Sequence, residues 1–488
     1  MELVFVVGCF IIIKNYRHRF TAKRFLLSFD VFVIYRRNAE VAKLCVVGLG
    51  YVGLVTASCF ASLGHRVIGV DKDPQKVELL SSGSSPFFEP CLDELLKEGL
   101  DKKLISFSGD IEKAVSQSEI IFICVGTPSK ENGQADMSQV EEVSRIIAKN
   151  LNSYKLIVEK STVPAGTAER IKQTIKMSNA NQYICFDVAS NPEFLREGSA
   201  VADFSHPDRV VLGVDSIRAR DMLQDLYRDF NCPVLTVDIA TAELIKHASN
   251  AFLAMKISFI NLVADICEKV GANIGFVADG MGHDRRIGRD FLNAGAGYGG
   301  SCFPKDVKAF AAVAETLGID ATLLREVDRI NEKRISLIIK KAEEVLWVCK
   351  NKRIAVLGLA FKCNTDDIRE SPGMKLVLEL IRKGSSVACF DPKAMENARR
   401  NLISHDNQST FTETPYDAAK EADALVFMTE WPEFFQLDFQ RLKQLMRMPV
   451  IIDGRNMLCA EKMKKFGFLY VGIGSSCVNE MGLIACDI

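Results

Sequence analysis

The stretch Leu44-Cys45-Val46-Val47-Gly48-Leu49-Gly50-Tyr51-Val52-Gly53 decides the fold of this chain. Its four apolar residues predict a buried parallel strand, and the three glycines that follow match the G-x-G-x-x-G turn of dinucleotide-binding domains. Without side chains, these glycines permit a tight turn, close approach of a pyrophosphate and close packing of the next helix. That helix would begin at the turn, so its N-terminus would face the phosphates.

An acidic residue at the end of the next strand indicates which dinucleotide binds. A helix-like stretch, Leu54–Leu63, leads into a second apolar strand, Val67–Val70, which ends in Asp71. A carboxylate at this place accepts hydrogen bonds from the adenosine ribose hydroxyls, and it would repel a 2′-phosphate. The sequence therefore predicts that the cofactor is NAD rather than NADP.

A second informative stretch lies far downstream: Gly297-Tyr298-Gly299-Gly300-Ser301-Cys302-Phe303-Pro304-Lys305-Asp306. Its glycines let the backbone come close to a bound molecule. A thiol beside an amine and a carboxylate is also how proteins assemble an activated nucleophile. A single cysteine is more often a small buried apolar residue, so the catalytic interpretation depends on the dinucleotide turn upstream.

Composition restricts the class of protein. The 488 residues suggest two or three domains, and 48% apolar with 25% charged residues is ordinary for a globular chain. A formal net charge of −1 gives no indication of nucleic-acid binding. Fifteen scattered cysteines without a C-x-x-C pair, and only six histidines, predict neither a metal site nor a disulfide framework. Free thiols fit a reducing compartment, so we expect a cytoplasmic protein.

The first 42 residues differ from the rest of the chain in that they combine apolar runs with a cluster of basic residues. An apolar run of eleven residues, Leu3–Ile13, precedes a basic stretch; it is too short to span a bilayer, and a signal peptide would carry its positive charge first. A second apolar patch, Phe25–Tyr35, is interrupted by polar residues. We interpret residues 1–42 as an appendage of unknown role and expect no stable membrane insertion, although a membrane-associated anchor stays open.

Strand-like and helix-like runs alternate over residues 43–238. This alternation predicts a doubly wound α/β sheet, the NAD-binding domain. The further strand-like runs of this part are Ile120–Val125, Leu156–Val158, Val188–Ser190 and Val210–Gly213.

The pattern then changes to helices over residues 239–345. Thr241–Val270 contains neither proline nor glycine and has apolar residues at helical spacing, which predicts a helix of about 45 Å that bridges two domains. Helices are also expected at Val307–Leu317 and Leu323–Val348. Because the apolar positions of the long helix cover more than one stripe, we expect it to pack against its symmetry mate in a homodimer or higher homo-oligomer.

A second α/β unit occupies residues 346–488. Ile354–Leu357 leads into a degenerate glycine turn, and Ser386–Phe390 ends in Asp391. Ala424–Met428 and Val450–Ile452 continue the strands. The fold class is therefore α/β, with two Rossmann-like domains joined by a long central helix and a helical middle domain. Two nucleotide-type domains imply two bound nucleotides, of which one is NAD and the other is part of the substrate.

From about Lys43 to Gly474 the chain closely resembles the UDP-glucose/GDP-mannose dehydrogenase family. Its cysteine loop, with Arg286-Ile287-Gly288 upstream, is similar to the UDP-glucose branch. The motifs that carry the resemblance, in order, are Val46–Gly53, Val125–Pro128, Glu159–Pro164, Asn191–Gly198, Glu243–Asn250, Asp284–Gly288, the cysteine loop, Phe361–Ser371 and Asp453–Arg455.

The resemblance implies a NAD-dependent four-electron oxidation of UDP-glucose at C6 to UDP-glucuronate, with two NADH formed per turnover. Cys302 would add to the intermediate aldehyde, giving a thiohemiacetal and then a thioester that water hydrolyses. Lys246 and Asn250 lie one helical turn apart, so both would reach the oxygen at C6. Asp306 would serve a water or a proton relay with Lys246.

The remaining roles that the resemblance implies concern water, cofactor and substrate. Glu193 would perform acid/base work and Thr162 would place water. The implied cofactor contacts are Gly48, Leu49, Gly50, Tyr51, Val52, Gly53, Asp71, Lys76, Thr127, Glu197, Lys305 and Arg369. The implied substrate contacts are Glu193, Phe194, Leu195, Lys246, Asn250, Arg286 from a partner subunit, Asn293, Tyr298, Gly299, Phe361, Lys362 and Arg455.

Other interpretations stay open at this point. The same chemistry on UDP-N-acetylhexosamine or GDP-mannose is the nearest alternative, and an inactive NAD- or UDP-sugar-binding regulator is one of a different class. A two-electron β-hydroxyacid dehydrogenase shares the layout but needs no cysteine loop. Taken singly, Lys246 reads as a solvated helix lysine and Glu193 as the cap of a helix that starts at Phe194.

Overall fold

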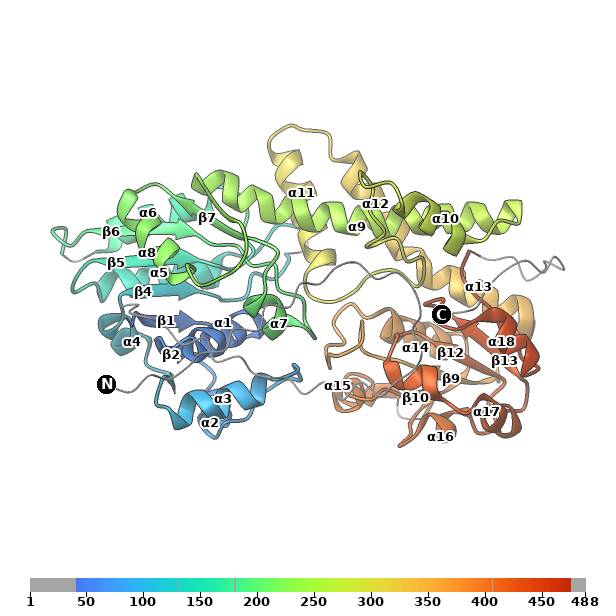
Figure 1. The fold of residues 1–488 in the computed structure, drawn as a ribbon. Helices are drawn as coiled ribbons and strands as arrows, with labels where there is room; N and C mark the ends of the chain where they lie inside the picture. The colour runs from blue at the N-terminus through green and yellow to red at the C-terminus, as the bar shows by residue number, and fades with distance from the viewer. Residues whose placement is uncertain (1–40, 131, 180, 406, 475–488) are drawn as a thin grey trace, which may run out of the picture.

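The computed structural model describes residues 41–130, 132–179, 181–405 and 407–474. The chain forms two α/β lobes with helices running across them (Figure 1). Except for residues 41 and 42, the predicted appendage lies outside the described residues, so its interpretation stays a prediction.

The first lobe is built on an eight-stranded sheet of order β3-β2-β1-β4-β5-β6-β7-β8. All its strand pairs are parallel except β6–β7, a reversal that the sequence did not indicate. The strands are β1 (Lys43–Val47), β2 (Arg66–Val70), β3 (Ile105–Ser108), β4 (Ile120–Ile123), β5 (Lys155–Glu159), β6 (Phe186–Ser190), β7 (Val210–Val214) and β8 (Val234–Val237). The order reverses between β1 and β4, which is where ligands bind in open α/β sheets.

Helices cover both faces of this sheet. In β1, Leu44 and Val46 pack with the core on one face, and Cys45 and Val47 with the core on the other, because successive side chains of a strand point to opposite faces. The helices are α1 (Tyr51–Ser62), α2 (Pro74–Ser81), α3 (Leu92–Asp101), α4 (Ile111–Gln117), α5 (Ser138–Lys149), α6 (Thr167–Ser178), α7 (Ala200–Ser205) and α8 (Ile217–Leu226).

The glycine turn behaves as its sequence predicts. Gly48 has a φ of +93°, and a Cβ there would lie 2.6 Å from the carbonyl oxygen of Cys124. A Cβ on Gly53 would lie 1.8 Å from the carbonyl oxygen of Gly48. Any larger residue would push helix α1 away from strands β1 and β4.

The predicted long helix is present as α9 (Ile239–Val270), about 48 Å long. Asp238 caps its first turn by accepting a hydrogen bond from the Thr241 amide, and Gly271 ends it with a φ of +76°. Figure 1 shows α9 running from the first lobe to a position above the second. It is long and apolar enough to cross a membrane, yet 44% of its most apolar window is buried inside the protein.

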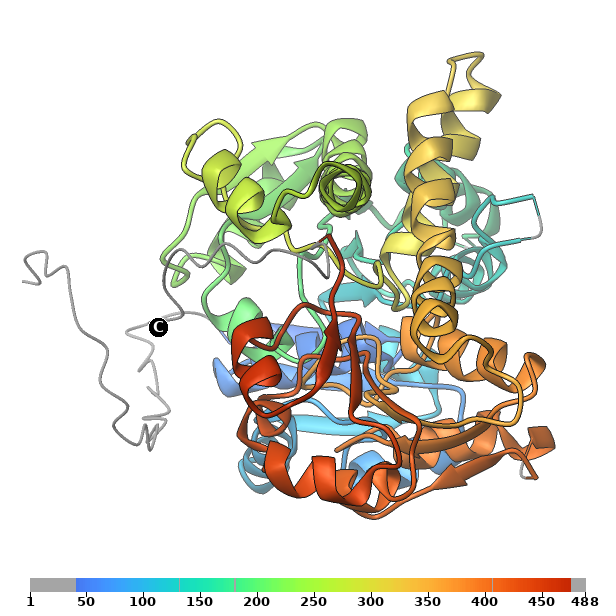
Figure 2. The same ribbon diagram turned by 90° about the vertical axis from the view of Figure 1, so that its right-hand side faces the viewer.

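One helix expectation is wrong. The predicted helix Leu323–Val348 is two helices, α12 (Thr322–Glu332) and α13 (Arg334–Leu346), separated at Lys333. Directly after the break, Arg334 is 1% exposed and donates to Asp265 of α9 at 2.7 Å and to the Gly295 carbonyl at 3.2 Å. Together with α10 (Ile274–Gly282) and α11 (Phe303–Thr316), these helices make up the helical segment between the two sheets in sequence. In Figure 2 its yellow and orange helices stand at one side of the molecule.

The second lobe carries a six-stranded parallel sheet of order β11-β10-β9-β12-β13-β14. Its strands are β9 (Arg353–Leu357), β10 (Ser386–Phe390), β11 (Ser409–Phe411), β12 (Ala424–Phe427), β13 (Val450–Asp453) and β14 (Leu469–Val471). Its helices are α14 (Pro372–Arg382), α15 (Met395–Asn401), α16 (Pro415–Ala419), α17 (Phe439–Leu445) and α18 (Ala460–Lys465), with 3₁₀ turns η1 (Ile403–His405) and η2 (Pro432–Gln436). The predicted fold class, two Rossmann-like domains joined by a long helix, is confirmed.

Candidate active site

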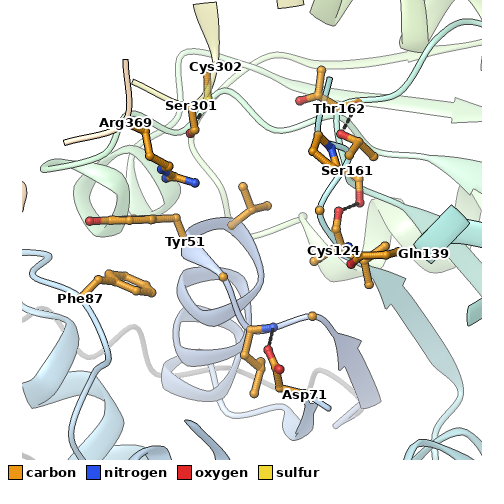
Figure 3. A pocket seen from close by; sticks show the side chains of 18 of the residues that line it. Tyr51, Asp71, Phe87, Cys124, Gln139, Ser161, Thr162, Ser301, Cys302 and Arg369 are labelled. Atoms are coloured by element: carbon orange, nitrogen blue, oxygen red, sulfur yellow. Dashed lines mark hydrogen bonds between the residues drawn. The ribbon is translucent and has the colours of Figure 1, made fainter. Parts of the chain in front are cut away.

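A cavity of about 1290 Å³ lies where β1, β4 and β5 end and where the second lobe meets the first. Ordinary small-molecule sites enclose roughly 300–1,000 Å³, so this one has room for a dinucleotide together with part of a second molecule. Asp71 lies at one end and Cys302 at the other (Figure 3). The residues of the predicted site that line it are Gly48, Leu49, Gly50, Tyr51, Val52, Asp71, Lys76, Thr127, Thr162, Glu193, Leu195, Glu197, Cys302, Lys305 and Arg369.

The Asp71 end of the cavity has the features that NAD requires. The N-terminus of α1 points into it, and a Cβ on Gly50 would meet no protein atom within 4 Å, so a pyrophosphate can reach the backbone there. Burial alone would raise the pKa of Asp71, but hydrogen bonds from Lys76 and from the amides of Asp73 and Leu49 hold that pKa below its usual value. Asp71 is therefore an anionic acceptor, and the residues present fit NAD.

Tyr51 connects the glycine turn to the second lobe. Its ring stacks on Phe87 with centroids 3.8 Å apart, and its hydroxyl lies 3.0 Å from Thr365 Oγ1 and donates to Asp366 Oδ1 at 3.0 Å. The second lobe therefore forms one wall of the cofactor cavity, with Arg369 on that wall beside Tyr51 (Figure 3).

Cys302 stands at the N-terminus of α11, close to Ser301 Oγ at 3.7 Å. The loop reaches this position because Gly300 has a φ of +80° and packs against the Phe361 ring, which a Cβ would approach to 2.8 Å. Burial and the charge of Glu193 raise the pKa of the Cys302 thiol to about 11, although Lys246 acts in the opposite direction. With this pKa the Cys302 thiol is protonated near neutral pH.

Buried polar side chains from three elements meet beside Cys302. Lys246 Nζ of α9 pairs with Glu193 Oε1 at 3.0 Å, and both side chains are about 5% exposed or less. One turn later, Asn250 donates to Asp306 Oδ2 at 2.6 Å, and Lys305 pairs with Asp306 Oδ1 at 2.7 Å. The structure thus brings together all the predicted catalytic residues of α9 and α11.

The charge states of these groups are set by one another. Burial would lower the pKa of Lys246, but electrostatic interactions, above all with the Glu193 carboxylate, outweigh burial and raise it. Burial would likewise raise the pKa of Asp306, but Lys305 and Lys246 hold it low. Lys246 is therefore a firmly protonated ammonium, suited to stabilising negative charge on an oxygen rather than to accepting a proton.

Glu193 is not a helix cap, because residues 191–196 form no helix and α7 begins only at Ala200. Its second oxygen, Oε2, accepts from the Leu195 amide at 2.5 Å. On the other side of the cavity, Thr127 Oγ1 donates to the Thr162 carbonyl at 2.9 Å and accepts from Lys305 Nζ at 3.4 Å. These bonds fix the loops after β4 and β5 against α11.

A carboxylate pair joins the two lobes near the cysteine. Ser301 Oγ donates to Glu197 Oε1 at 2.9 Å. Arg369 pairs with Asp367 at 2.7 Å and with Glu197 at 3.4 Å. Burial and the nearby charge of Asp367 raise the pKa of Glu197 to about 8. The predicted cofactor residues Glu197 and Arg369 are thus in direct contact across the cavity.

Three predicted substrate residues of the second lobe surround the cysteine loop. The Phe361 ring packs on Gly300. Burial lowers the pKa of Lys362, although the charge of Glu197 acts to raise it. Arg455 donates to the carbonyls of Met428, Gly297 and Phe361 at 2.8 to 3.0 Å. Within this chain, Arg455 therefore holds the cysteine loop against the second lobe.

Other predicted substrate residues do not line the cavity of this chain. Arg286 pairs with Asp284, and its side chain is 89% exposed. Asn293 accepts from Arg289 at 2.7 Å. The Tyr298 ring packs edge-on against Phe303, and the side chain is 6% exposed. A Cβ on Gly299 would lie 2.4 Å from the Glu370 carbonyl, so this glycine allows the cysteine loop to pack closely on the second lobe.

Sequence reasoning missed several residues that line the cavity, among them Phe87, Cys124, Gln139, Ser161, Asp366 and Asn397. Asp366 lies inside the quoted Phe361–Ser371 motif and Ser161 inside the Glu159–Pro164 motif, so the motifs themselves carried a signal. Phe87 and Asn397 lie in segments without any such pattern, and only the folded chain brings them to the site.

Asp71 and Asp391, which follow the second strands of the two α/β units, have different surroundings. Asp391, at the end of β10, is 1% exposed and accepts from the amides of Leu359 and Ala360 and from Trp431 Nε1. These protein donors leave it no room for a ribose, whereas Asp71 lines the open cavity. The second unit therefore does not repeat the ribose contact of the first.

Comparisons with known proteins agree with this geometry. Residues 42–231, 240–333 and 355–460 match, in turn, the NAD binding domain, the central domain and the UDP binding domain of the UDP-glucose/GDP-mannose dehydrogenase family. The chain is 42% identical to the UDP-glucose 6-dehydrogenase TuaD of Bacillus subtilis over 437 residues, which cover 90% of this chain and 94% of that one. It is 45% identical to the UDP-glucose 6-dehydrogenase of Rhizobium meliloti over 439 residues, 88% and 99% of the two chains.

A solved structure gives the same answer. The UDP-glucose dehydrogenase of the hyperthermophilic archaeon Pyrobaculum islandicum superposes with a TM-score of 0.84 at 39% identity, over 91% of this chain and 100% of that one. The UDP-D-ManNAc dehydrogenase of Pyrococcus horikoshii superposes with a TM-score of 0.78 at 28% identity, over 89% and 100%. This chain belongs to the UDP-glucose/GDP-mannose dehydrogenase family.

Proposed function

We propose that this protein oxidises UDP-glucose at C6 to UDP-glucuronate with two NAD per turnover. One observation carries the proposal: Cys302 stands at the end of the NAD cavity, beside a buried ammonium (Lys246) and buried carboxylates (Glu193, Asp306). A simple alcohol dehydrogenase needs no nucleophile there. The UDP-glucose activity of the relatives at 42–45% identity supports this substrate.

In the first oxidation, Lys246 and Asn250 hold the hydroxyl oxygen at C6. NAD, when bound between the glycine turn, Asp71 and Thr127, accepts a hydride from that carbon in each of the two oxidations. The Lys246 ammonium stabilises the negative charge that develops on the oxygen, and Asp306 fixes Asn250 through its 2.6 Å hydrogen bond. The hydroxyl proton passes to a water that the Asp306 carboxylate serves, and Lys305 on the cavity wall pairs with the same carboxylate at 2.7 Å.

In the second half, the Cys302 sulfur adds to the aldehyde and keeps it from escaping. The ammonium of Lys246 and the N-terminus of α11 favour the thiolate electrostatically, and the proton of the thiol ends on the former aldehyde oxygen as the hydroxyl of the thiohemiacetal. The thiohemiacetal that forms is oxidised to a thioester. Glu193 then takes a proton from the attacking water, while Thr162 helps to place that water.

A panel of nucleotide sugars tests the substrate. With purified protein and NAD, UDP-glucose is expected to give the highest kcat/KM. A higher value with GDP-mannose or a UDP-N-acetylhexosamine would overturn the substrate assignment while leaving the chemistry intact. Binding of UDP-glucose without any NADH formation would favour a regulator instead.

Cofactor choice gives a separate prediction. Asp71→Ser removes the ribose acceptor and frees Lys76, now 2.8 Å from Asp71 Oδ2, to meet a 2′-phosphate. We expect kcat/KM to fall roughly tenfold or more with NAD and to rise at least tenfold with NADP, since one hydrogen bond to a charged group contributes about 1.5–3 kcal/mol. Steady-state rates with both cofactors measure this. An unchanged NAD-to-NADP ratio would show that Asp71 does not face the ribose.

We further propose that the protein works as a homodimer built on α9. An exposed apolar stripe follows this helix, with residues 44–69% exposed at spacings of three to eight. A self-complementary contact about a two-fold axis would bury both copies at once. The stripe consists of Leu244, Phe252, Phe259, Leu262, Ile266 and Val270.

Arg286 is the substrate residue that the dimer is expected to supply in trans. Each of Arg286→Ala and Cys302→Ala should be nearly inactive alone. After subunit exchange, one site of each mixed dimer has both residues intact, so about a quarter of all sites should recover at equal mixing. Light scattering and NADH formation measure this. A fully active monomer, or no recovery after verified exchange, would defeat the trans role.

The domain boundaries and the location follow the same proposal. We assign residues 43–238 to NAD binding, 239–345 to the middle domain with the cysteine loop, and 346–488 to UDP-sugar binding. A cytoplasmic location is supported by the described cysteines, which are free.

A further inference from the structure

A second cavity, of about 80 Å³, lies beside Glu193 in the first lobe. We name it the side cavity; Lys160, Asn191, Glu193 and Arg209 are among its lining residues. Glu193 and Leu195 line both the side cavity and the large cavity that holds Cys302. The side cavity also reaches the exposed residue His206, so it opens to solvent. Glu193 is thus adjacent to two separate spaces.

A buried lysine without a counter-ion lies in its wall. Lys160 is 4% exposed, and its Nζ donates to Asn191 Oδ1 at 3.0 Å and to the Asn191 carbonyl at 3.4 Å. Among the residues that the structure describes, Lys160 forms no ion pair. The adjacent Glu159 forms no ion pair with it, and burial raises the pKa of Glu159 well above its usual value. Burial also lowers the pKa of Lys160 itself, as expected for an amine that has no carboxylate partner. An ammonium has three N–H donors, so one of them is left for a further acceptor.

A second buried lysine shows what a structural role looks like. Lys155 is 2% exposed, and it donates to the carbonyls of Ser116 and Ser118 at 3.2 and 2.6 Å. These carbonyls lie at the end of α4, where a lysine favourably caps the helix. Lys160 caps no helix. Burying an ammonium without a counter-ion is costly, and such groups gather at functional sites.

The proposed reaction consumes one water after both oxidations. At that stage the large cavity contains the cofactor and the sugar that is bound to Cys302, so the route for water through it is obstructed. The side cavity is polar and wide enough for two or three waters at roughly 30 Å³ each. Its contact with Glu193 places such water beside the group that must accept a proton.

We propose that the side cavity is a water-binding site that supplies the hydrolytic water to Glu193, with Lys160 and Asn191 holding the water. The inference rests on the proposed function. The water oxygen bonds to the thioester carbonyl carbon, the C–S bond breaks, and the proton of the water passes to Glu193. The sulfur leaves as a thiolate and takes up a proton, which gives the free carboxylic acid and the Cys302 thiol. Lys160 acts as a positioning residue, because it touches the water path and not the sugar.

The test is a rapid-mixing experiment on Lys160→Met with UDP-glucose and excess NAD. We expect a burst of two NADH per site at close to the wild-type rate, followed by a steady state at least tenfold slower than that of the wild type. The thioester of Cys302 should accumulate and be visible in the intact mass. Lys155→Met is the matched control: it removes a buried lysine of the same lobe and should lower stability without accumulation of thioester.

A second pair of variants acts at the mouth of the side cavity. His206→Trp should obstruct it and prolong the thioester lifetime, whereas His206→Ala should leave that lifetime unchanged. Slow thioester hydrolysis after a normal NADH burst, in Lys160→Met or in His206→Trp, supports the water site. If Lys160→Met does not fold, the thioester lifetime of His206→Trp is the deciding measurement. Wild-type thioester lifetimes in the folded variants would overturn it. Absence of any NADH burst in the wild type would instead refute the proposed function.

Discussion

Cys302→Ser is expected to lower turnover on the order of 10⁴-fold or more, because removal of a catalytic nucleophile has effects of this size. A serine hydroxyl ionises far less readily than a thiol, and an ester hydrolyses more slowly than a thioester. The structure adds a reason: even the thiol has its pKa raised to about 11 by burial, so an alcohol at this place would stay protonated throughout. Steady-state NADH formation measures the loss.

The control for this variant is a serine substitution at a cysteine that, unlike Cys302, does not line the cavity. Cys363 is partly buried in the neighbouring loop of the second lobe, and Cys363→Ser should change turnover only a few-fold. NAD binding by Cys302→Ser, followed by calorimetry, should match the wild type. Sugar trapped covalently on residue 302 would agree with the account, whereas steady production of the acid at a rate near wild type would refute a nucleophilic role.

Lys246→Met is expected to lower kcat by about 10²–10³-fold, the usual effect of removing a group that stabilises a developing oxyanion. It should also destabilise the fold by about 3–5 kcal/mol, because Glu193 loses its partner in a buried ion pair. Activity and the free energy of unfolding are therefore measured together, at a temperature where the variant is folded.

A double variant separates the two effects. Lys246→Met with Glu193→Gln removes the unpaired charge, so stability should recover towards the wild-type value while activity stays low. If Lys246→Met alone kept kcat within tenfold of the wild type, the ammonium would not stabilise the transition state. If the double variant were less stable than the single one, the ion pair would not explain the loss of stability.

The parts of the site that were predictable follow from local rules. The glycine turn and Asp71 belong to one strand–helix–strand unit, so the spacing alone places them together. Lys246 and Asn250 share a face of α9 because they are four residues apart. In each case the sequence separation is short and the geometry of a single element decides the outcome.

The parts that were not predictable depend on contacts between distant elements. Lys246 meets Glu193 across 53 residues, and Tyr51 meets Asp366 across 315; no periodicity encodes either pair. The buried Arg334 likewise donates to Asp265 of α9 across 69 residues of sequence. The raised thiol pKa of Cys302 results from burial, which no local pattern reveals.

Arg455 shows the limit of transferring a role by motif. The motif places it near the substrate, yet in this chain its guanidinium donates to three carbonyls, including that of Gly297 in the cysteine loop. Its replacement would therefore disturb the loop as well as any bound sugar nucleotide. The motif alone predicted a substrate contact, whereas the partners that Arg455 has within this chain become known only from the folded structure.

We propose that the protein performs a four-electron oxidation that passes through Cys302. The number of NADH molecules formed per UDP-glucose is the most direct measure of this reaction. A limiting, known amount of UDP-glucose is converted to completion with excess NAD, and NADH is counted by absorbance while the sugar product is quantified by chromatography. We expect two NADH per UDP-glucose consumed, with UDP-glucuronate as the product. One NADH per sugar, with an aldehyde released, would contradict it.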